Sequence, residues 1–341
     1  MPTAISLFSG AGGDTLGLEK AGVTVTGFVE WKEPMIRTHL QNFPNSTLIG
    51  KDIRSITEEQ LIPYVGETDI VFAGFPCQGL SKAGKKKKDD ARNNLFREFV
   101  RITNIVRPRW IIGENVKHIM RMTTPDDRPV PDVIKEAFEE IGYTMADPMV
   151  LKANAFGVPQ KRERCFFVGH LDPAATFSWQ DVLEKAVPTS SLQTLLEPSL
   201  ENAIEITDEQ ARRYGIQSWV EAPEGTDVTG NPPLNLRKCM DIDELSFGKR
   251  ASPTHSEVID PYGVSKTLIC TYNRMPRMFV PVRCSGQLYL RPYTVHEAKQ
   301  IQGFPPEYVI TGNRISAIEQ IGNAVPPQLV EAIVQSLDLE L

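Results

Sequence analysis

Short apolar runs alternate with amphipathic segments through the first half of the chain. Five runs have the length and composition of buried strands: 4–8, 23–29, 69–73, 110–112 and 164–169. Four segments repeat apolar residues at helical spacing: 14–21, 33–42, 95–106 and 133–141. Asp14 heads the first of these segments, where its side chain is placed to cap a helix. Strands that alternate with helices predict an α/β fold with a mainly parallel sheet.

The pattern weakens after residue 170. Residues 172–290 are rich in Pro, Thr, Ser and Asp and show few strong periods, which predicts a separate, loop-rich module. Helical spacing returns over 295–301 and 326–337. A chain of 341 residues has the length of one large domain or two unequal ones, since domains average about 150 residues.

Composition and charge bear on the class of partner. Hydrophobic residues make up 41% and charged residues 23%, which excludes collagen-like, disordered and coiled-coil chains. The net charge of −6 argues against nucleic acid as a partner, because phosphate contacts need Lys and Arg. The charge is sorted along the chain, however: residues 180–230 hold ten acids and three bases, whereas 237–291 hold nine bases and five acids. One face can therefore be basic although the whole chain is acidic.

The cysteines do not form a disulfide or zinc pattern. They are odd in number and widely spaced, without a C-x-x-C pair: Cys77, Cys165, Cys239, Cys270 and Cys284. We therefore expect no metal site. The first residues lack the pattern of a signal peptide, and no apolar run approaches the roughly 20 residues of a membrane span. These features predict a cytoplasmic protein with reduced thiols and no membrane partner.

A glycine-rich turn, 9–13, follows the first predicted strand. Strand, glycine-rich turn and helix form a nucleotide-binding geometry, because glycines let the backbone approach the ligand. Glu30 ends the next strand, where an acid can accept hydrogen bonds from ribose hydroxyls, and Trp31 is placed to stack on adenine. NAD and S-adenosylmethionine fit equally well. A plain tight turn that needs positive φ, with Glu30 a solvated strand end, is the alternative interpretation.

Cys77 comes directly after the strand 69–73, in the sequence Gly74-Phe75-Pro76-Cys77-Gln78. The carboxyl end of a central strand is where α/β folds place ligands, and a thiolate there can act as a nucleophile. A buried structural cysteine is the alternative. Lys82 and the run 85–88 follow closely, which suits an anionic polymer substrate but equally a solvated loop.

Two further segments carry candidate chemistry. Glu114 ends the strand that begins at 110, so it is expected at the same sheet edge as Cys77, where partial burial can make it a proton donor. A capping turn is the alternative. If 160–164 is extended, Arg162 and Arg164 point to one face and suit phosphate or carbonyl oxygens. An edge strand with alternating solvated charges is the alternative there.

Taken together and in order, these segments resemble the C5-cytosine DNA methyltransferase family of the bacterial, restriction-modification-like type. The resemblance rests on motifs within roughly the first 170 and last 50 residues. Each motif is a hypothesis that its position on a strand, turn or helix can confirm. They are 8–13, 30–31, 52–53, 74–81, 92–96, 114–116, 160–164, 291–294, 302–305 and 321–326. One departure is Ser6, where the family often has an acid; it bears on a contact with the methionine moiety of the cofactor.

The resemblance implies a Rossmann-like S-adenosylmethionine-dependent methyltransferase fold with a second, smaller, loop-rich target-recognition domain. The catalytic domain would comprise 1–175 and 292–341, and the target-recognition domain 176–291. Cys77 would add to C6 of cytosine, Glu114 would hydrogen-bond N3 and the exocyclic amine, and Arg164 would hold O2. Arg162 would order the catalytic loop or bind a phosphate. The target cytosine must be flipped out of the duplex, and S-adenosylhomocysteine is the co-product.

The resemblance also implies two sets of binding residues. The cofactor set is Phe8, Ser9, Gly10, Gly12, Gly13, Glu30, Trp31, Asp52, Ile53, Gly74, Pro76, Leu95, Asn323 and Ala324. The DNA set is Gln78, Ser81, Lys82, Arg92, Arg237, Arg274 and Arg277. The loop 78–94 would close over the target base. The three arginines of 237–277 either read base edges or contact phosphates.

The partner implied is double-stranded DNA, bound by a monomer in the cytoplasm of a bacterium or in phage infection, associated with the nucleoid and paired with a restriction endonuclease. A tRNA cytosine methyltransferase shares the fold and motifs, but its Cys-Phe-Thr signature is absent from the recognition region. A nicotinamide oxidoreductase would explain only the glycine turn, and a non-catalytic relative would be expected to lose Cys77 or Glu114.

Overall fold

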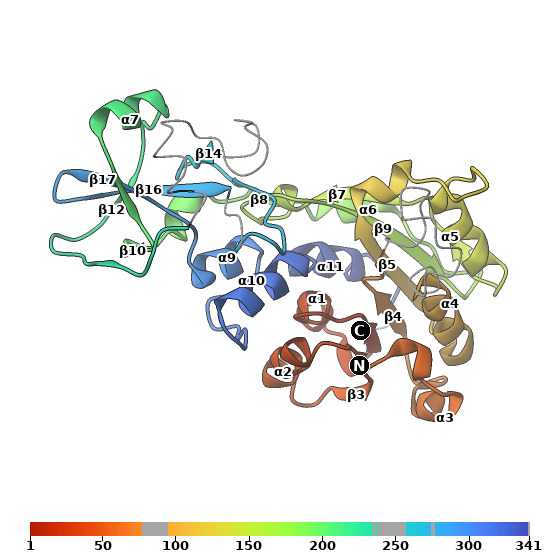
Figure 1. Ribbon diagram of the computed structural model, residues 1–341. Coiled ribbons are helices and arrows are strands. Elements are labelled where there is room, and N and C mark those ends of the chain that lie inside the picture. The colour runs from red at the N-terminus through yellow and green to blue at the C-terminus, as the bar shows by residue number, and fades with distance from the viewer. Residues whose placement is uncertain (77–94, 234–235, 237–256, 274–276, 340–341) are drawn as a thin grey trace. The chain divides into compact units, whose positions relative to one another are not determined.

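The computed structural model describes residues 1–76, 95–233, 236, 257–273 and 277–339, and Figure 1 shows their arrangement. The chain divides into two compact units. The first unit comprises Met1–Phe156, Glu163–Val187 and Ala324–Leu341, and the second comprises Gly157–Arg162 and Pro188–Asn323. These are packing units. The functional division at 175/176 and 291/292 remains a prediction.

The first unit is built on one large sheet with strand order β3-β2-β1-β4-β5-β9-β6, and β7 also pairs with β9. The bounds are β1 Thr3–Leu7, β2 Thr24–Val29, β3 Thr47–Gly50, β4 Ile70–Ala73, β5 Trp110–Val116, β6 Thr144–Met145, β7 Met149–Lys152 and β9 Glu163–His170. Strands β1 to β5 pair in parallel with one another, whereas β9 is antiparallel to β5, β6 and β7. The α/β prediction is confirmed, and the carboxyl ends of β1, β4 and β5 meet at one edge.

The helices of the first unit are α1 Gly13–Lys20, α2 Glu33–Asn42, α3 Glu58–Leu61, α4 Leu95–Val106, α5 Val130–Glu139, α6 Trp179–Glu184 and α11 Pro327–Val334. Short 3₁₀ helices are η1 Ile53–Ser55, η2 Ile62–Tyr64, η4 Lys117–Arg121 and η5 Ala153–Ala155. The bounds of α2 and α4 match the sequence prediction. Helix α4 repeats Phe96, Phe99, Ile102 and Val106 on one face, and all four are buried.

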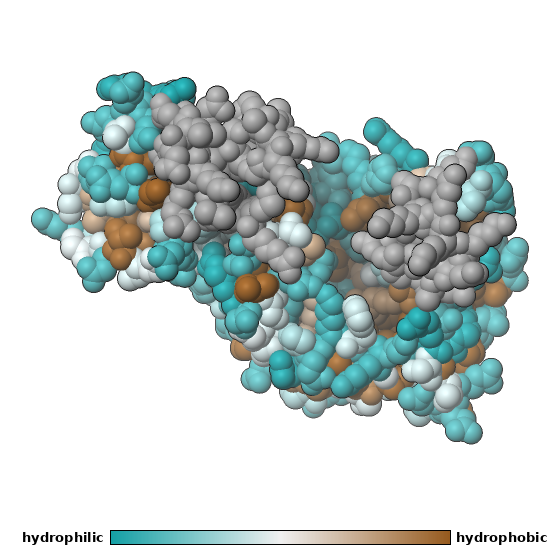
Figure 2. Space-filling model, viewed as in Figure 1, coloured by the Kyte–Doolittle hydropathy of each residue, from teal (hydrophilic) through white to brown (hydrophobic). Residues whose placement is uncertain are grey.

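One apolar core joins the sheet to two helices. Leu7, Val71 and Ile111 of the central strands share this core with Phe99 of α4 and Phe138 of α5. Helices α1 and α11 lie side by side (Figure 1). The side shown in Figure 2 is mostly hydrophilic with small apolar patches, as expected when the long apolar runs lie inside.

The second unit contains more strand than the sequence predicted. One sheet has the order β11-β17-β16-β12 with β14 also on β16, and two separate pairs are β10 with β13 and β8 with β15. The bounds are β8 Gln160–Lys161, β10 Leu200–Glu201, β11 Ile204–Ile206, β12 Val220–Glu221, β13 Val228–Thr229, β14 Glu257–Val258, β15 Ser265–Lys266, β16 Met278–Cys284 and β17 Gln287–Arg291. Its helices are α7 Asp208–Arg213, η6 Leu192–Thr194, α9 Val295–Ile301 and α10 Arg314–Asn323. Most of these strands have two or three residues, which is too short to produce a periodic signal.

Within the described ranges, no helix is long and apolar enough to cross a membrane. The same ranges contain no group of three or more His, Cys, Asp or Glu side chains that could hold a metal ion.

Candidate functional site

The glycine-rich turn lies between β1 and α1. Gly10 and Gly12 have φ values of 56° and 78°, and Phe8 has a φ of 60°, which is unusual for a residue with a side chain. The Gly12 amide donates to the carbonyl of Ser9 at 2.9 Å and closes the turn. The hydroxyl of Ser9 is buried and has no hydrogen-bond partner among the described residues. A strained backbone and an unpaired buried hydroxyl are features of a turn that is shaped around a ligand.

Glu30 follows β2 and reaches back to this turn. Its Oε2 accepts a hydrogen bond from the Gly10 amide at 2.9 Å. Its Oε1 accepts from the amides of Trp31 at 2.9 Å and Lys32 at 2.8 Å. Burial raises the pKa of Glu30, and these three amide donors oppose the rise. A carboxylate offers about four acceptor positions, so roughly one remains for a ligand hydroxyl. Trp31 beside it is 70% exposed.

Asp52 and Ile53 lie at the start of η1. The Asp52 side chain accepts from the amide of Arg54 and forms an ion pair with the Arg54 guanidinium at 2.6 Å, which lowers the pKa of Asp52. Both partners are about half exposed, so the pair contributes little to stability. Ile53 is buried in the core of the first unit.

The ends of β1, β4 and β5 bring three predicted site residues together. A Cβ atom placed on Gly74 would lie 3.6 Å from Oε2 of Glu114 and 3.9 Å from the carbonyl oxygen of Phe8. Asn115, next to Glu114, is buried and donates to the carbonyl of Phe75 at 2.7 Å. This bond fixes the segment that leads to Pro76 against β5. The glycine turn, Gly74 and Glu114 therefore share one sheet edge. Cys77, the residue predicted to accompany Glu114 there, lies outside the described residues.

Glu114 is held by an arginine from the adjacent antiparallel strand. Nε of Arg164 lies 2.8 Å from Oε1 of Glu114, and both side chains are largely buried. Burial lowers the pKa of Arg164 while the charge of Glu114 opposes that change, and a guanidinium stays protonated in either case. Cys165, one residue further on, is buried and has its pKa raised to about 12, first by burial and then by Glu114. Cys165 is therefore an unreactive thiol.

The sequence analysis misassigned Asp14. Helix α1 begins at Gly13 with Gly12 as its N-cap, and there is no side-chain cap, so the expectation that Asp14 caps this helix is wrong. Asp14 instead lies in the first turn, is 2% exposed, and accepts a hydrogen bond from the hydroxyl of Ser6 in β1. Burial raises its pKa to about 7, with a smaller contribution from Glu114. Asp14 is a titratable group of this site that the sequence pattern did not reveal, because acids at helix starts are common.

Arg162 does not accompany Arg164. Strand β8 ends before Arg162 and β9 begins after it, and its guanidinium is fully buried in the second unit. Nη1 donates to the carbonyl of Leu268 at 2.9 Å, and Nη2 donates to the carbonyl of Gly322 at 3.0 Å. The prediction that Arg162 and Arg164 point to one face is therefore wrong. Arg162 donates its hydrogen bonds to backbone carbonyls, whereas Arg164 forms an ion pair with Glu114.

The remaining predicted site residues differ in burial, and some lie outside the described ranges. Leu95 begins α4 and is partly buried, Asn323 ends α10 and is exposed, and Ala324 is buried. Arg277 precedes β16, with a buried Nε that has no partner among the described residues. Seven predicted residues lie outside the described ranges: Cys77, Gln78, Ser81, Lys82, Arg92, Arg237 and Arg274.

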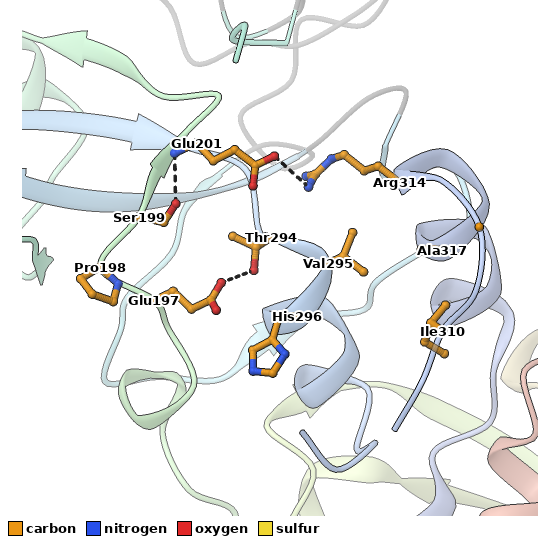
Figure 3. Close-up of a pocket in the computed structure, with 11 residues that line it drawn as sticks. Glu197, Pro198, Ser199, Glu201, Thr294, Val295, His296, Ile310, Arg314 and Ala317 are labelled. Atoms are coloured by element: carbon orange, nitrogen blue, oxygen red, sulfur yellow. Dashed lines mark hydrogen bonds and ion pairs between the residues drawn. The ribbon is translucent and has the colours of Figure 1, made fainter. Parts of the chain in front are cut away.

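The segment 291–294 has a structural role in the second unit. Arg291 and Glu297 are fully buried and form an ion pair, with Nη2 2.6 Å from Oε1. Thr294 caps α9, and its hydroxyl also donates to Glu197 at 2.6 Å (Figure 3). Glu197 and Thr294 line an open cavity of about 610 Å³ together with Glu201 and Arg314, whose nearest oxygen and nitrogen are 3.9 Å apart. Of the predicted catalytic residues that the structure describes, Glu114, Arg162 and Arg164 do not line this cavity.

The sheet order, the glycine turn after β1 and the buried acid after β2 define a Rossmann-like methyltransferase class of α/β protein. The chain belongs to the C-5 cytosine-specific DNA methylase family, whose model matches residues 3–338. It is an enzyme of DNA cytosine methylation, and the alternative of a tRNA methyltransferase is not favoured.

Curated relatives agree with the family assignment, and a solved structure agrees with the fold. Type II methyltransferase M1.HphI of Haemophilus parahaemolyticus is 30% identical over 98% of this chain and 86% of its own length. Type II methyltransferase M.DdeI of Desulfomicrobium norvegicum is 30% identical over 98% of this chain and 88% of its own length. The S. pombe Dnmt2 methyltransferase matches in fold, with a TM-score of 0.69, 15% identity and 98% coverage of both chains.

Proposed function

We propose that this enzyme transfers a methyl group from S-adenosylmethionine to C5 of a flipped-out cytosine in a specific double-stranded DNA site. The observation that carries the proposal is the meeting of Phe8, Gly74 and Glu114 at one sheet edge, with Glu114 held by Arg164. A cofactor turn, the strand that leads to Cys77 and a buried carboxylate then face one reaction centre. A base in the duplex cannot reach such a centre, so it must be extruded.

The residues present fit the cofactor. The Ser9 hydroxyl is a buried polar atom that lacks a partner among the described residues, and it lies in the turn that would hold the methionine part. Glu30 keeps roughly one acceptor position for a ribose hydroxyl, and the exposed Trp31 ring can stack on adenine. The bound cofactor supplies an electrophilic methyl group. The other proposed contacts are Phe8, Gly10, Gly12, Gly13, Asp52, Ile53, Gly74, Pro76, Leu95, Asn323 and Ala324.

The proposed chemistry begins at Cys77. Its thiolate adds to C6 of cytosine, which makes C5 nucleophilic. Glu114 takes up a proton from solvent as the base binds and donates it to N3 as charge builds on the ring. Arg164 holds the ring oxygen O2 and, through its 2.8 Å ion pair, fixes the orientation of Glu114. The bound methyl donor would supply its electrophilic methyl group to C5, and S-adenosylhomocysteine would leave. A base acting through water removes the C5 proton, and the bond between Cys77 and C6 breaks.

Arg162 has a positioning role in this proposal. Its two bonds join the segment at Leu268 to the end of α10 at Gly322, directly before the proposed cofactor residues Asn323 and Ala324. A fully buried guanidinium with both terminal nitrogens bound is poorly suited to contact a phosphate.

The DNA partner is proposed to contact the segment 78–94, which lies outside the described residues, and residues of the second unit. The candidates for DNA contacts are Gln78, Ser81, Lys82, Arg92, Arg237, Arg274 and Arg277. Relatives named Type II methyltransferases support pairing with a restriction endonuclease, and we propose that the enzyme acts as a monomer.

Replacing the nucleophile tests this proposal. Cys77→Ser should abolish transfer of labelled methyl groups to DNA and covalent trapping on DNA that contains 5-fluorocytosine. Cys270→Ser, at an exposed cysteine of the second unit, is the matched control and should keep both activities. Near-normal activity of Cys77→Ser would contradict the mechanism. Methyl transfer to tRNA rather than DNA would contradict the proposed substrate.

A further inference from the structure

Asp14 is a buried acid at the cofactor turn without a described counter-charge. It lies in the first turn of α1, and its carboxyl group accepts hydrogen bonds from the hydroxyl of Ser6 in β1 and from the backbone amides of Asp14 and Thr15. These donors are neutral, so they do not replace a counter-charge. Among the residues that the structure describes, no ion pair involves Asp14. An ionised carboxylate in such a place is unfavourable unless a cation comes to it.

The charged groups around Asp14 do not supply that cation. Strands β1 and β2 carry no ionisable side chain, and β5 presents Glu114, which is itself negative. Helix α11, which packs on α1, carries Glu331 as its one ionisable side chain. On α1 itself, Glu19 and Lys20 are exposed at the far end of the helix.

The turn and the first residues of α1 contain two further buried polar groups that lack partners. The hydroxyls of Ser9 and Thr15 are both buried, and neither has a hydrogen-bond partner among the described residues. Folding therefore leaves a buried acid without a cation, and a buried hydroxyl of the turn without a hydrogen-bond partner, where β1 leads into α1. Such an arrangement is typical of a site that is completed by a ligand with hydrogen-bond donors and positive charge.

We propose that Asp14 binds the ammonium group of the amino-acid part of the methyl donor, and that Asp14 releases its proton to solvent when this cation arrives. The inference rests on the proposed function. Asp14 goes from carboxylic acid to carboxylate, one proton enters the solvent, and the ligand ammonium keeps its own protons. Below pH 7 an α-amino group is protonated, so the cation is present in the incoming ligand.

Proton linkage measured by calorimetry tests this inference. Binding of S-adenosylhomocysteine, in buffers of different ionisation enthalpy, should release about 0.9 proton at pH 6 and about 0.5 at pH 7, because burial raises the pKa of Asp14 to about 7. Binding of 5′-methylthioadenosine, which lacks the amino-acid part, should release none. Asp14→Asn resembles the neutral acid in shape, so it should fold; it should lose the proton release and bind S-adenosylhomocysteine about tenfold more weakly.

The control and the ligand pair separate this inference from the proposed function. Glu331→Gln on α11 should release protons as the unchanged protein does. If Asp14→Asn binds S-adenosylhomocysteine with undiminished affinity and proton release, the proton comes from another group and the inference is overturned. Equal proton release with 5′-methylthioadenosine would also overturn it, while leaving the proposed function intact. If neither ligand binds the unchanged protein, the proposed cofactor is wrong as well.

Discussion

Arg162→Lys separates a positioning role from a catalytic one. The substitution keeps the charge but loses the planar fork that reaches the carbonyls of Leu268 and Gly322 at 2.9 and 3.0 Å. An ammonium group can satisfy one of these carbonyls and leaves the other buried without a donor. A hydrogen bond to a charged group contributes about 1.5–3 kcal/mol, so we expect a loss of about 3 kcal/mol in the free energy of unfolding of the second unit.

Two measurements check this expectation. Urea unfolding followed by the fluorescence of Trp219, the tryptophan of the second unit, gives the stability. Amide exchange over 265–270 should increase, because the bonds of Arg162 hold this segment. The KM for S-adenosylmethionine should rise while kcat stays close to normal, as expected when binding rather than chemistry is disturbed. Lys161→Ala, at the exposed neighbour, should change stability by less than about 0.5 kcal/mol.

The opposite pattern would refute the reasoning. If Arg162→Lys unfolds at the normal urea concentration and exchanges normally, yet loses about a hundredfold in kcat, then Arg162 contacts the reacting groups. The buried hydrogen bonds to Leu268 and Gly322 would then have no consequence for stability.

Three further predictions concern stability. Gly17→Ala should destabilise the first unit by about 1–3 kcal/mol in urea unfolding, because the added Cβ would lie 2.5 Å from the Pro327 carbonyl, and the helix-propensity gain of about 1 kcal/mol is smaller. Burial lowers the pKa of His39 to about 3, so the folded protein keeps this imidazole neutral while the unfolded chain binds a proton below about pH 6.5. The free energy of unfolding should therefore fall by up to about 5 kcal/mol as the pH falls from 6.5 towards 3. The melting temperature of His39→Phe should fall less steeply with acid. Glu297→Gln leaves the Arg291 charge buried without a counter-charge and should cost about 3–5 kcal/mol; an unchanged melting temperature would contradict this.

Local patterns predicted the parts of the fold that local forces decide. The bounds of α2 and α4 and the positions of the central strands follow from the spacing of apolar residues, because each element must bury one face. Phe8, Gly74 and Glu114 meet at one sheet edge because the carboxyl ends of neighbouring parallel strands lie at the same edge. The direction of β9 could not be predicted, since an apolar run is the same in parallel and antiparallel pairing.

Long-range contacts explain where the sequence interpretation failed. The partners of Arg162 lie 106 and 160 residues away along the chain, so no short pattern could show that its donors are occupied. Asp14 has the spacing of a capping residue, yet its carboxyl group turns to Ser6 on the preceding strand. Both misinterpretations concern polar side chains whose role depends on tertiary neighbours rather than on the period of their own element.

The same reasoning limits what can be concluded from charge. The nine bases of 237–291 suggested a basic face, but four of them lie within the described residues and three of these four have partners inside the protein. Arg291 is buried against a carboxylate, Arg283 lies 3.7 Å from the centre of a tryptophan ring, and Lys266 pairs with a glutamate. A base engaged in this way releases few counterions when DNA binds. The salt dependence of DNA binding should therefore be shallower than nine phosphate contacts would give, and it should change most when Arg277 or the bases outside the described ranges are replaced.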